Sequence, residues 1–503
     1  MTRAVKLSAL ISSEMLQNEA AQLPDISVND ITSHSGRVAA GGLFLAIQGY
    51  GGHGLDHLTE ALDARPAAVA WEPTEGYSEP DLPAEIAGIC VPDLGNQVAG
   101  IADRFFSTPS ASLRITGITG TNGKTTTAWL ASRALNVLGT RTGYMGTLGY
   151  GVSAHLKTSA LTTPGVIAVH RRLRELADDG AEALVMEVSS HGLDQGRIDA
   201  VRVDTAAFTN LSRDHLDYHG DIESYAAAKA KLFAIDSLGS AVINTGDEYG
   251  RRFASMFGAE MNLLTVAMDG TPGATDADIV AARTAAVHGG MVVTLRDRSG
   301  TAELHSEMLG AFNAENLLVA TGIVVANGYS LEEAATALGQ CTPPPGRMQC
   351  IRVPHKPLVI VDFAHTPDAL TKALQAARDH ISDEAPLIVV FGCGGDRDQG
   401  KRAEMGRAAA ASADFVVLTS DNPRSEDPAA IIDDIRAGIA DAGQVRVETD
   451  RRLAIRKAID ATDPSGIVLI AGKGSEDYQI IGERTEAFSD VAVASQYMRG
   501  LQS

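Results

Sequence analysis

Short apolar runs alternate with stretches of helical periodicity along the chain from residue 113 onward. The run Leu113–Gly120 predicts a strand that enters a glycine-rich turn. Thr125–Leu138 predicts the helix that follows, because its large apolar side chains recur along one helical stripe. Alternating strands and helices are typical of α/β proteins. Further strands are predicted at Ala183–Val188, Thr205–Asn210 and Ser240–Asn244.

The alternation is most regular after residue 346, where helical stretches separate five apolar runs. Helical connections between successive strands favour a doubly wound, mostly parallel sheet. The five predicted strands are Leu358–Phe363, Leu387–Phe391, Phe415–Thr419, Val445–Val447 and Ile467–Ala471.

Polar clusters follow four of these five runs. In a doubly wound sheet, ligands bind beyond the carboxyl ends of the strands, so we expect the four clusters to converge on one edge. The clusters are Asp362–His365, Gly394–Arg397, Asp421–Arg424 and Gly472–Glu476.

The proline-rich run Cys341–Gly346 separates this last region from the part of the chain before it. Three successive prolines continue neither a helix nor a central strand. A chain of 503 residues is expected to form about three domains. We therefore predict domains at residues 1–100, 101–343 and 344–503, with the first boundary near residues 95–112.

Composition narrows the classes of partner. Apolar residues make up 45% of the chain and charged residues 21%, which is globular usage. The formal net charge of −21 disfavours general binding to nucleic acid or anionic membranes, so anionic ligands need a local positive site. Four scattered cysteines, with no C-x-x-C pair, indicate neither a disulfide framework nor a zinc site. No apolar run is long enough to cross a membrane, and we expect a cytoplasmic protein.

The clearest chemical signal is the glycine loop between the first predicted strand and its helix. Backbone N–H groups of such a loop cradle phosphate oxygens, Lys124 neutralises them, and the Thr125 hydroxyl is placed for Mg²⁺. The glycine spacing differs from the usual P-loop, and an ordinary glycine-rich turn is the alternative. ATP binding is the working hypothesis, and the loop residues are Gly120, Thr121, Asn122, Gly123, Lys124, Thr125 and Thr126.

Two further stretches carry metal-ligand chemistry. Glu187 ends a predicted strand, and His215 lies in a polar run after the next predicted strand. A carboxylate and an imidazole together are able to hold a divalent ion near bound phosphates. Each residue alone is also compatible with a salt-bridged carboxylate or a capped loop histidine, so the metal role depends on their combination with the glycine loop.

Lys229 is a third candidate. A helix predicted around Ser224–Ala234 places Tyr225 and Phe233 on the face of Lys229. Lys231 points away from that face, so we expect Lys229 to be the less exposed lysine. Desolvation lowers a lysine pKa, and a neutral amine is able to react with CO₂ to give a carbamate, which is an anionic metal ligand. The alternative is a lysine whose stem packs on apolar neighbours while its ammonium reaches water.

Six motifs closely resemble those of the ATP-dependent Mur ligases of peptidoglycan synthesis, and they extend over nearly the whole chain. The resemblance implies a three-domain α/β protein. Its parts are an N-terminal UDP-sugar-binding domain, a central P-loop-type ATP-binding domain and a C-terminal Rossmann-like doubly wound domain that binds an amino acid. The motifs are Gly120–Thr126, Glu187–Gly192, Asn210–His215, Tyr225–Lys229, Phe312–Asn316 and Asp362–Pro367.

The resemblance also implies a reaction. The family phosphorylates a substrate carboxylate with ATP, and an amine then attacks the acyl phosphate to give an amide, ADP and phosphate. Matching positions imply catalytic roles for Lys124, Glu187, His215 and Lys229. They imply Mg²⁺ contacts for Thr125, Glu187, His215 and carbamylated Lys229, and ATP contacts for Asn313, Asn316, Arg347, Asp362 and His365.

Two runs, Gly394–Arg402 and Asp421–Arg424, are similar to those of family members that add meso-diaminopimelate to UDP-N-acetylmuramoyl-L-alanyl-D-glutamate. Diaminopimelate differs from lysine by a carboxylate at its far end, which an arginine fork binds through two charge-assisted hydrogen bonds. The implied contacts to the nucleotide-sugar peptide are Ser35, Thr162, Thr163, Ser189, Gln195 and Arg197. Those to the amino acid are Arg397, Asp421, Asn422, Pro423, Arg424, Gly472 and Glu476.

Some alternatives stay open at this point. The chain has Gly36 and Ser475 where the family commonly has Arg and His, and Ser35 is also compatible with an ordinary turn residue. A lysine-adding relative is expected to lack an arginine at position 424. A ligase like folylpolyglutamate synthetase, or a P-loop kinase or switch, would share the glycine loop. We expect a monomer that binds small-molecule substrates and neither nucleic acid nor membranes.

Overall fold

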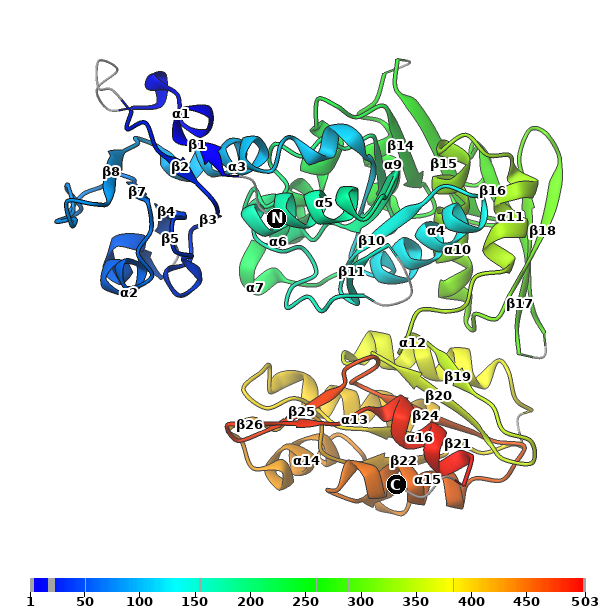
Figure 1. The fold of residues 1–503 in the computed structure, drawn as a ribbon. Coiled ribbons are helices and arrows are strands. Elements are labelled where there is room, and N and C mark those ends of the chain that lie inside the picture. The colour runs from blue at the N-terminus through cyan, green and yellow to red at the C-terminus, as the bar shows by residue number, and fades with distance from the viewer. Residues whose placement is uncertain are drawn as a thin grey trace.

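Three sheets, each with its own buried core, form the three parts of the molecule (Figure 1). The computed structural model describes residues 4–16, 23–49, 51–152, 156–258, 260–287, 289–382 and 384–500. In the view of Figure 1, the N-terminal part lies to one side of the central part and the C-terminal part lies below it. Within the described residues, no helix combines the length and the apolar composition that a membrane crossing needs.

The N-terminal sheet is parallel, and helices cover both of its faces. Leu43 packs with α3 (Leu94–Phe105), whereas its neighbour Phe44 packs with α2 (Leu58–Asp63), because successive strand residues face opposite ways. Since α3 and Phe106 belong to this core, the predicted boundary at residue 100 falls inside a helix. The strands, in spatial order, are β3 (Ile31–Thr32), β4 (Leu43–Ala46), β7 (Ala68–Trp71) and β8 (Ala87–Cys90). Smaller elements are α1 (Leu7–Leu10) and the pairs β1 (Val5–Lys6) with β2 (Ser27–Val28) and β5 (Gln48–Gly49) with β6 (Gly52–His53).

The central sheet contains ten strands and is parallel except at its edges. The four predicted strands are confirmed as β9, β12, β13 and β14. The antiparallel strands β16–β18 were not predicted, because their hairpin connections lack the helical crossovers on which the prediction relied. Strands β10, β11 and β15 were not predicted either. In spatial order the strands are β11 (Gly149–Gly151), β10 (Thr142–Gly146), β12 (Ala183–Glu187), β9 (Arg114–Thr119), β13 (Thr205–Phe208), β14 (Ser240–Asn244), β15 (Asn262–Met268), β16 (Ile279–Val287), β17 (Gly290–Arg296) and β18 (Thr301–Ser306).

Helices cover both faces of the central sheet. The predicted helix after the glycine loop is confirmed as α4 (Lys124–Val137). It is buried beyond the single stripe that its sequence predicts, because α10 and α11 pack over it. Its face of the sheet also carries α10 (Ala311–Ala326) and α11 (Leu331–Gly339), and the opposite face carries α5 (Val166–Asp178), α8 (Ile222–Ala230) and α9 (Glu248–Ala254).

The C-terminal sheet confirms the predicted doubly wound architecture, and all five predicted strands are present. An antiparallel edge strand, β19, and a hairpin of β25 and β26 were not predicted. In spatial order the strands are β19 (Gln349–Ile351), β20 (Leu358–Asp362), β24 (Ile467–Ala471), β21 (Leu387–Phe391), β22 (Phe415–Leu418) and β23 (Val445–Val447). Helices α12 (Pro367–Arg378), α13 (Gly400–Ser412) and α14 (Pro428–Arg436) cover one face, α15 (Arg451–Ala461) and α16 (Asp490–Met498) cover the other, and the hairpin comprises β25 (Tyr478–Ile481) and β26 (Arg484–Ala487).

The central and C-terminal parts are in contact. The proline-rich segment lies between α11 and β19, where the Trp129 indole N–H donates to the Thr342 carbonyl at 3.0 Å. Leu309 of the central part is fully buried in the core cluster of the C-terminal part, to which Leu370 also belongs. The central and C-terminal parts therefore share buried apolar surface at Leu309.

Candidate active site

The glycine loop between β9 and α4 has a shape that only glycine allows at two positions. Gly120 has a φ of 150° and Gly123 a φ of 84°, in the region that side chains disfavour. A β-carbon at Gly120 would collide with Thr209 Oγ1, and one at Gly123 would collide with Asn316 Oδ1. The loop leads into the N-terminus of α4, where unpaired N–H groups favour a bound anion.

The segment after β13 holds this loop in place. The N–H of Thr121 donates to the Asn210 carbonyl at 2.8 Å, and that of Asn122 donates to the Asn210 side chain at 3.0 Å. Thr121 Oγ1 accepts from the Ser212 N–H at 3.0 Å. Thr126 is buried in the first turn of α4. Two loops far apart in the sequence therefore form one rigid unit.

Lys124 folds back over the loop. Its Nζ donates to the carbonyl oxygens of Gly120, at 2.7 Å, and Thr121, at 2.9 Å. Burial lowers the pKa of Lys124, while the nearby charges of Glu187 and Asp214 act in the opposite direction. The ammonium group thus lies over the loop that is predicted to bind phosphate.

Glu187 is a buried carboxylate at the end of β12, with 1% of its surface exposed. Its Oε1 accepts from the Tyr144 hydroxyl at 2.6 Å and from the Thr147 N–H at 2.8 Å, and its Oε2 accepts from the Thr125 hydroxyl at 2.8 Å. A β-carbon at Gly146 would collide with Oε1, so glycine is required there. These partners are neutral donors, and they orient the carboxylate without neutralising it. Tyr144 and Thr147 were missed because no motif marks the end of β10.

Lys229 is almost fully buried, as predicted, with 1% of its surface exposed. Its Nζ donates to the Gly120 carbonyl at 2.8 Å and lies 4.2 Å from the centre of the Tyr225 ring. Burial holds the pKa of Lys229 well below its usual range, and the charge of Lys124 adds to this effect. The neutral amine, which is the form that reacts with CO₂, is therefore easier to reach here than on an exposed lysine.

Lys231 shows the contrast within the same segment. Helix α8 ends at Ala230, earlier than predicted, and continues as the 3₁₀ turn η5 (Lys231–Ala234). Lys231 is exposed and pairs with Asp194 at 2.8 Å. The two lysines are thus distinguished by their burial, as the helical spacing predicted.

His215 stands at the turn before α7 (Leu216–His219), with a left-handed φ of 53° and a half-exposed ring. Its Nε2 lies 3.4 Å from the Asp214 carboxylate. Its ring centre lies 4.9 Å from that of His191 and 6.1 Å from that of Tyr225. The cluster places His215 next to the helix that carries Lys229.

The chemistry of the donors fits a hard divalent cation such as Mg²⁺. Thr125 and Glu187 present oxygen atoms 2.8 Å apart beside the glycine loop, and a carbamate on Lys229 would add a further carboxylate-like group. In the part of the chain that the structure describes, no three His, Cys, Asp or Glu side chains are placed to share one ion. The predicted set contains only two residues of these types, Glu187 and His215, so the magnesium site stays a prediction.

The residues predicted to contact ATP approach the loop from the other side. Asn313 and Asn316 are buried at the start of α10, and Asn316 Nδ2 donates to Asn313 Oδ1 at 2.9 Å. Asn316 also touches Gly123 of the loop. Arg347, from the segment before β19, is close enough for its charge to act on Lys124 and on Asp362.

Asp362 and His365 lie at the end of β20 in the C-terminal part. The Asp362 carboxylate accepts from the N–H groups of Met348 and Ala364, both at 2.8 Å. Desolvation raises the pKa of Asp362, and Arg347 opposes the shift. His365 is exposed, and its Nδ1 lies 2.9 Å from the Phe363 carbonyl. The charge of Arg347 thus acts both on Asp362 of the C-terminal part and on Lys124 of the glycine loop.

Three of the residues predicted for the nucleotide-sugar peptide gather near Glu187. Thr163 Oγ1 donates to the Glu187 carbonyl at 3.0 Å and accepts from the Ser189 N–H at 3.0 Å. Thr162 Oγ1 lies 3.0 Å from the hydroxyl of Thr147. These hydroxyl groups therefore line the end of β12 beside the buried carboxylate.

Arg197 and Gln195 extend this group. The Arg197 guanidinium donates to the Thr163 carbonyl at 2.8 Å and to Gln195 Oε1 at 2.6 Å and 3.0 Å. Gln195 in turn donates to the Tyr218 hydroxyl at 3.1 Å. The central part thus holds Arg197 close to the carboxyl edge of its own sheet.

Ser35 is not part of this cluster. It lies in the 3₁₀ turn η2 (Ser35–Arg37) of the N-terminal part, which is packed near α2. Arg171 of α5 donates to the Asp30 carboxylate at 2.7 Å and so ties the N-terminal sheet to the central part. The role of Ser35 in binding the nucleotide sugar stays a prediction.

The loops after β21 and β22 meet at the predicted edge of the C-terminal sheet. The Gly395 N–H donates to the Asn422 carbonyl at 2.9 Å, and Arg424 Nη1 donates to the Gly395 carbonyl at 2.7 Å. Arg424 has a left-handed φ of 51°, and a β-carbon at Gly395 would collide with the Pro423 carbonyl. Arg397 is exposed on the first of these loops. The two predicted arginines therefore belong to interlocked loops.

The loop after β24 joins them. Lys473, which the sequence analysis missed, is fully buried, and its Nζ donates to Glu476 Oε2 at 2.8 Å and to Asn422 Oδ1 at 3.1 Å. Asn422 Nδ2 also donates to Glu476 Oε2, at 2.9 Å. A β-carbon at Gly472 would lie 2.7 Å from Asp421 Oδ2. The signal that could have identified Lys473 is a lysine two residues after a wholly apolar strand, just past a glycine.

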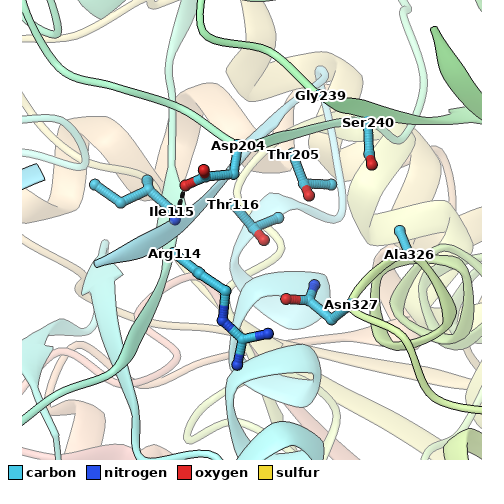
Figure 2. Close-up of a pocket in the computed structure, with 9 residues that line it drawn as sticks. All are labelled: Arg114, Ile115, Thr116, Asp204, Thr205, Gly239, Ser240, Ala326 and Asn327. Carbon is cyan, nitrogen blue, oxygen red and sulfur yellow. Dashed lines mark hydrogen bonds between the residues drawn. The ribbon is translucent and has the colours of Figure 1, made fainter. Parts of the chain in front are cut away.

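A separate hollow lies at the opposite edge of the central sheet (Figure 2). Its volume is about 240 Å³, and it is lined by the starts of β9, β13 and β14 and the end of α10. There the Asp204 carboxylate accepts from the Ile115 N–H at 2.7 Å. The glycine loop lies at the carboxyl end of β9, so this hollow is remote from the candidate site.

Comparisons with known proteins agree with this arrangement. Residues 118–324 match the family model described as Mur ligase middle domain, and residues 346–474 match that described as Mur ligase, glutamate ligase domain.

Relatives of known name are similar over nearly the whole chain. A UDP-N-acetylmuramoyl-L-alanyl-D-glutamate–2,6-diaminopimelate ligase from Xanthomonas oryzae pv. oryzae is 43% identical over 498 residues, which cover 99% of this chain and 98% of that protein. A protein of the same name from Pseudomonas aeruginosa is 45% identical over 476 residues, covering 94% of this chain and 95% of that protein. A solved structure with this name has a TM-score of 0.71 at 34% identity and covers 99% of both chains.

Proposed function

This chain belongs to the Mur ligase family, and from that membership we propose that it joins meso-diaminopimelate to UDP-N-acetylmuramoyl-L-alanyl-D-glutamate. It is an ATP-dependent amide ligase of peptidoglycan precursor synthesis. The observation that carries the choice of acceptor is the guanidinium of Arg424, which is held across two loops at the carboxyl edge of the C-terminal sheet.

In the first half of the reaction, the γ-phosphoryl group of ATP passes to a carboxylate of the nucleotide-sugar peptide. The loop N–H groups and Lys124 hold the phosphates, and their positive charge offsets the repulsion between two anions. Arg197 and Gln195 orient the carboxylate substrate beside Glu187. Mg²⁺ would be held by Thr125, Glu187, His215 and carbamylated Lys229, and when bound it neutralises charge on the phosphoryl oxygens.

In the second half, the amine of the acceptor attacks the acyl carbon, an amide bond forms and phosphate leaves. The amine must be unprotonated to attack, and Arg424 and Arg397 orient it by binding the far carboxylate of diaminopimelate. Lys473 and Asn422 keep Glu476 beside this edge, where a carboxylate is able to bind the acceptor's ammonium group.

The test measures phosphate release from ATP, Mg²⁺ and UDP-N-acetylmuramoyl-L-alanyl-D-glutamate with diaminopimelate, with lysine or with no amine. We expect release to require an amine acceptor, and lysine to have a kcat/KM roughly 10- to 100-fold lower than that of diaminopimelate, because lysine leaves the arginine fork unpaired.

Each alternative predicts a different outcome. Release that needs no amine would identify a kinase or switch, and a preference for lysine would identify the lysine-adding activity. Release that needs a folate and glutamate would identify an activity like that of folylpolyglutamate synthetase. Equal use of both amines would leave the ligase activity standing and remove the role of Arg424.

The proposal also covers the setting of the reaction. The scattered cysteines and the small anionic substrates favour a cytoplasmic enzyme that acts as a monomer and binds neither nucleic acid nor membranes. Size-exclusion chromatography with light scattering would check the oligomeric state.

A further inference from the structure

The loops after β21 and β22 carry Arg397 and Arg424, and they are called the acceptor loops below. Behind them lies a group of charged side chains that the proposed reaction does not use. Arg402, in the first turn of α13, has 1% of its surface exposed. Its Nη2 donates to Glu426 Oε1 at 2.8 Å, and its Nη1 donates to Asp434 Oδ2 at 2.9 Å. Glu426 lies in the turn before α14, two residues after Arg424. The buried cation is thus joined to the loop that carries the acceptor arginine.

Glu426 also contacts the neighbouring loop, which follows β21 and carries Asp396. The same Oε1 atom that Arg402 binds also accepts from the Asp396 N–H at 2.6 Å. The Asp396 carboxylate then accepts from the Ser425 hydroxyl at 2.6 Å and from the Ser425 N–H at 3.2 Å. Each loop therefore donates to a carboxylate of the other, and Arg402 fixes one of the two carboxylates from below.

The backbone conformation of the two loops shows why these contacts are needed to hold them. Asp396 and Arg424 have φ values of 52° and 51°, in the left-handed region that residues other than glycine rarely adopt. Asp396 directly precedes Arg397. Both acceptor arginines are therefore carried by backbone that is unfavourable unless surrounding contacts hold it.

We propose that Arg402, Glu426 and Asp396 are positioning residues that hold the loops of Arg397 and Arg424 in the geometry that recognises the far carboxylate of the acceptor. None of the three needs to touch the substrate. This inference rests on the proposed function, because it assumes that the two arginines bind diaminopimelate.

The two ion pairs of Arg402 supply a matched control. Glu426 and Asp434 bind the same guanidinium at nearly equal distances. Only Glu426 reaches the acceptor loops, whereas Asp434 lies on α14 with more than half of its side chain exposed. Removal of either carboxylate leaves Arg402 with one partner, so a general loss of ion pairing affects both variants alike.

The experiment compares Glu426→Ala with Asp434→Ala under saturating ATP and nucleotide-sugar peptide. We expect Glu426→Ala to raise the KM for diaminopimelate about tenfold or more, and to leave the KM for ATP within about twofold. Asp434→Ala is expected to change neither KM by more than about twofold. The preference for diaminopimelate over lysine, measured as a ratio of kcat/KM, should fall in Glu426→Ala alone.

Two milder variants guard against loss of folding. Glu426→Gln keeps an oxygen acceptor for Arg402 and Asp396, so its KM for diaminopimelate should lie between those of the wild type and Glu426→Ala. Ser425→Ala removes only an exposed hydroxyl and should raise this KM about threefold. Thermal unfolding of every variant establishes that the protein under study is folded.

The outcomes separate this inference from the proposed function. If the wild type does not use diaminopimelate, the proposed function fails. If the wild type uses it and both Glu426→Ala and Ser425→Ala keep the wild-type KM and acceptor preference, the positioning role is wrong. An equal rise in Asp434→Ala would also overturn it, because the effect would then follow from the loss of any partner of Arg402.

Discussion

The central site and the acceptor edge hold their charged groups in opposite ways. Around the glycine loop, Glu187 is held by neutral hydroxyl and N–H donors, and Lys229 by a backbone carbonyl. The acceptor edge is the carboxyl edge of the C-terminal sheet. There, Lys473 is paired with Glu476, and Arg402 with two carboxylates. A charge that neutral groups orient is not cancelled by a partner, so it stays available for the ATP and Mg²⁺ of the proposed reaction. Charges paired with each other instead build a frame that shapes the loops.

This difference leads to an expectation about kinetics. A substitution in the central site should lower kcat, because its charges act on the groups that react. A substitution among the paired charges at the acceptor edge should chiefly raise the KM for the amino acid. The predictions below test this division, starting with the largest effect.

Lys229→Ala should abolish ligation, with a loss of at least about 10³-fold in kcat, or roughly 4 kcal/mol of activation free energy. The reason is that the variant would lose the proposed carbamate and with it a ligand of the proposed Mg²⁺ site. Acceptor-dependent phosphate release measures the effect, and circular dichroism checks the fold. Lys231→Ala, two residues away and exposed, is the matched control and should keep activity within about twofold. Full activity of Lys229→Ala would contradict the carbamate role.

Asp490→Ala should destabilise the C-terminal part by about 3–5 kcal/mol, because it leaves the fully buried Arg451 without its carboxylate. The two residues form a bidentate pair with both contacts at 2.8 Å, and Arg451 also donates to the Ala471 carbonyl at the end of β24. Urea unfolding measures the loss. Lys372→Ala, which breaks an exposed pair, should cost about 0.5 kcal/mol or less, and an equal cost for both would refute the distinction.

Arg424→Ala should raise the KM for diaminopimelate roughly 10- to 100-fold, because the variant loses hydrogen bonds to a charged carboxylate. The kcat at saturating acceptor should change far less. Arg424→Lys keeps the charge but not the planar fork, so its KM should lie between the two. Steady-state kinetics with varied acceptor provide the measurement. A fall in kcat with an unchanged KM would place Arg424 in the chemical step instead.

The smallest expected effect concerns pH. The hydrogen bond from Arg402 holds the pKa of Glu426 below its ordinary value of 4.5. The charged carboxylate therefore stabilises the folded protein above pH 4.5, and this contribution is lost as the pH falls through the lowered folded-state value. The difference in unfolding midpoint between wild type and Glu426→Gln should shrink as the pH falls below that point. A difference that grows as the pH falls would show that the charged Glu426 carboxylate does not stabilise the folded protein.

Much of the fold could be predicted, because the strands of the central and C-terminal sheets are short apolar runs between helical stretches. Of the strands of these two sheets that escaped prediction, β10 and β15 lie inside the central sheet. The others, β16–β18 with β11 and β19, lie at or towards sheet edges. Edge strands pair through their backbone and carry a weaker apolar pattern. Their positions depend on which strand they meet, and that information is spread over the chain.

The candidate site shows the same division. The glycine loop and Lys229 could be found from local spacing, because turn geometry and helical faces are set by neighbours in the sequence. Tyr144, Thr147 and Lys473 could not be found in this way. Tyr144 and Thr147 are defined by Glu187, which is 43 and 40 residues away, and Lys473 by Asn422, which is 51 residues away.

The sequence by itself determined the family, the α/β architecture and the loop that is predicted to hold ATP, because these depend on contiguous motifs and regular periodicity. Only the tertiary structure decided how the charges are held. Burial of Lys229 against Gly120 and the pairing of Arg402 with Glu426 both join residues that lie far apart along the chain. The free energy of a charge depends on its distance from partners and from water, and folding alone sets those distances.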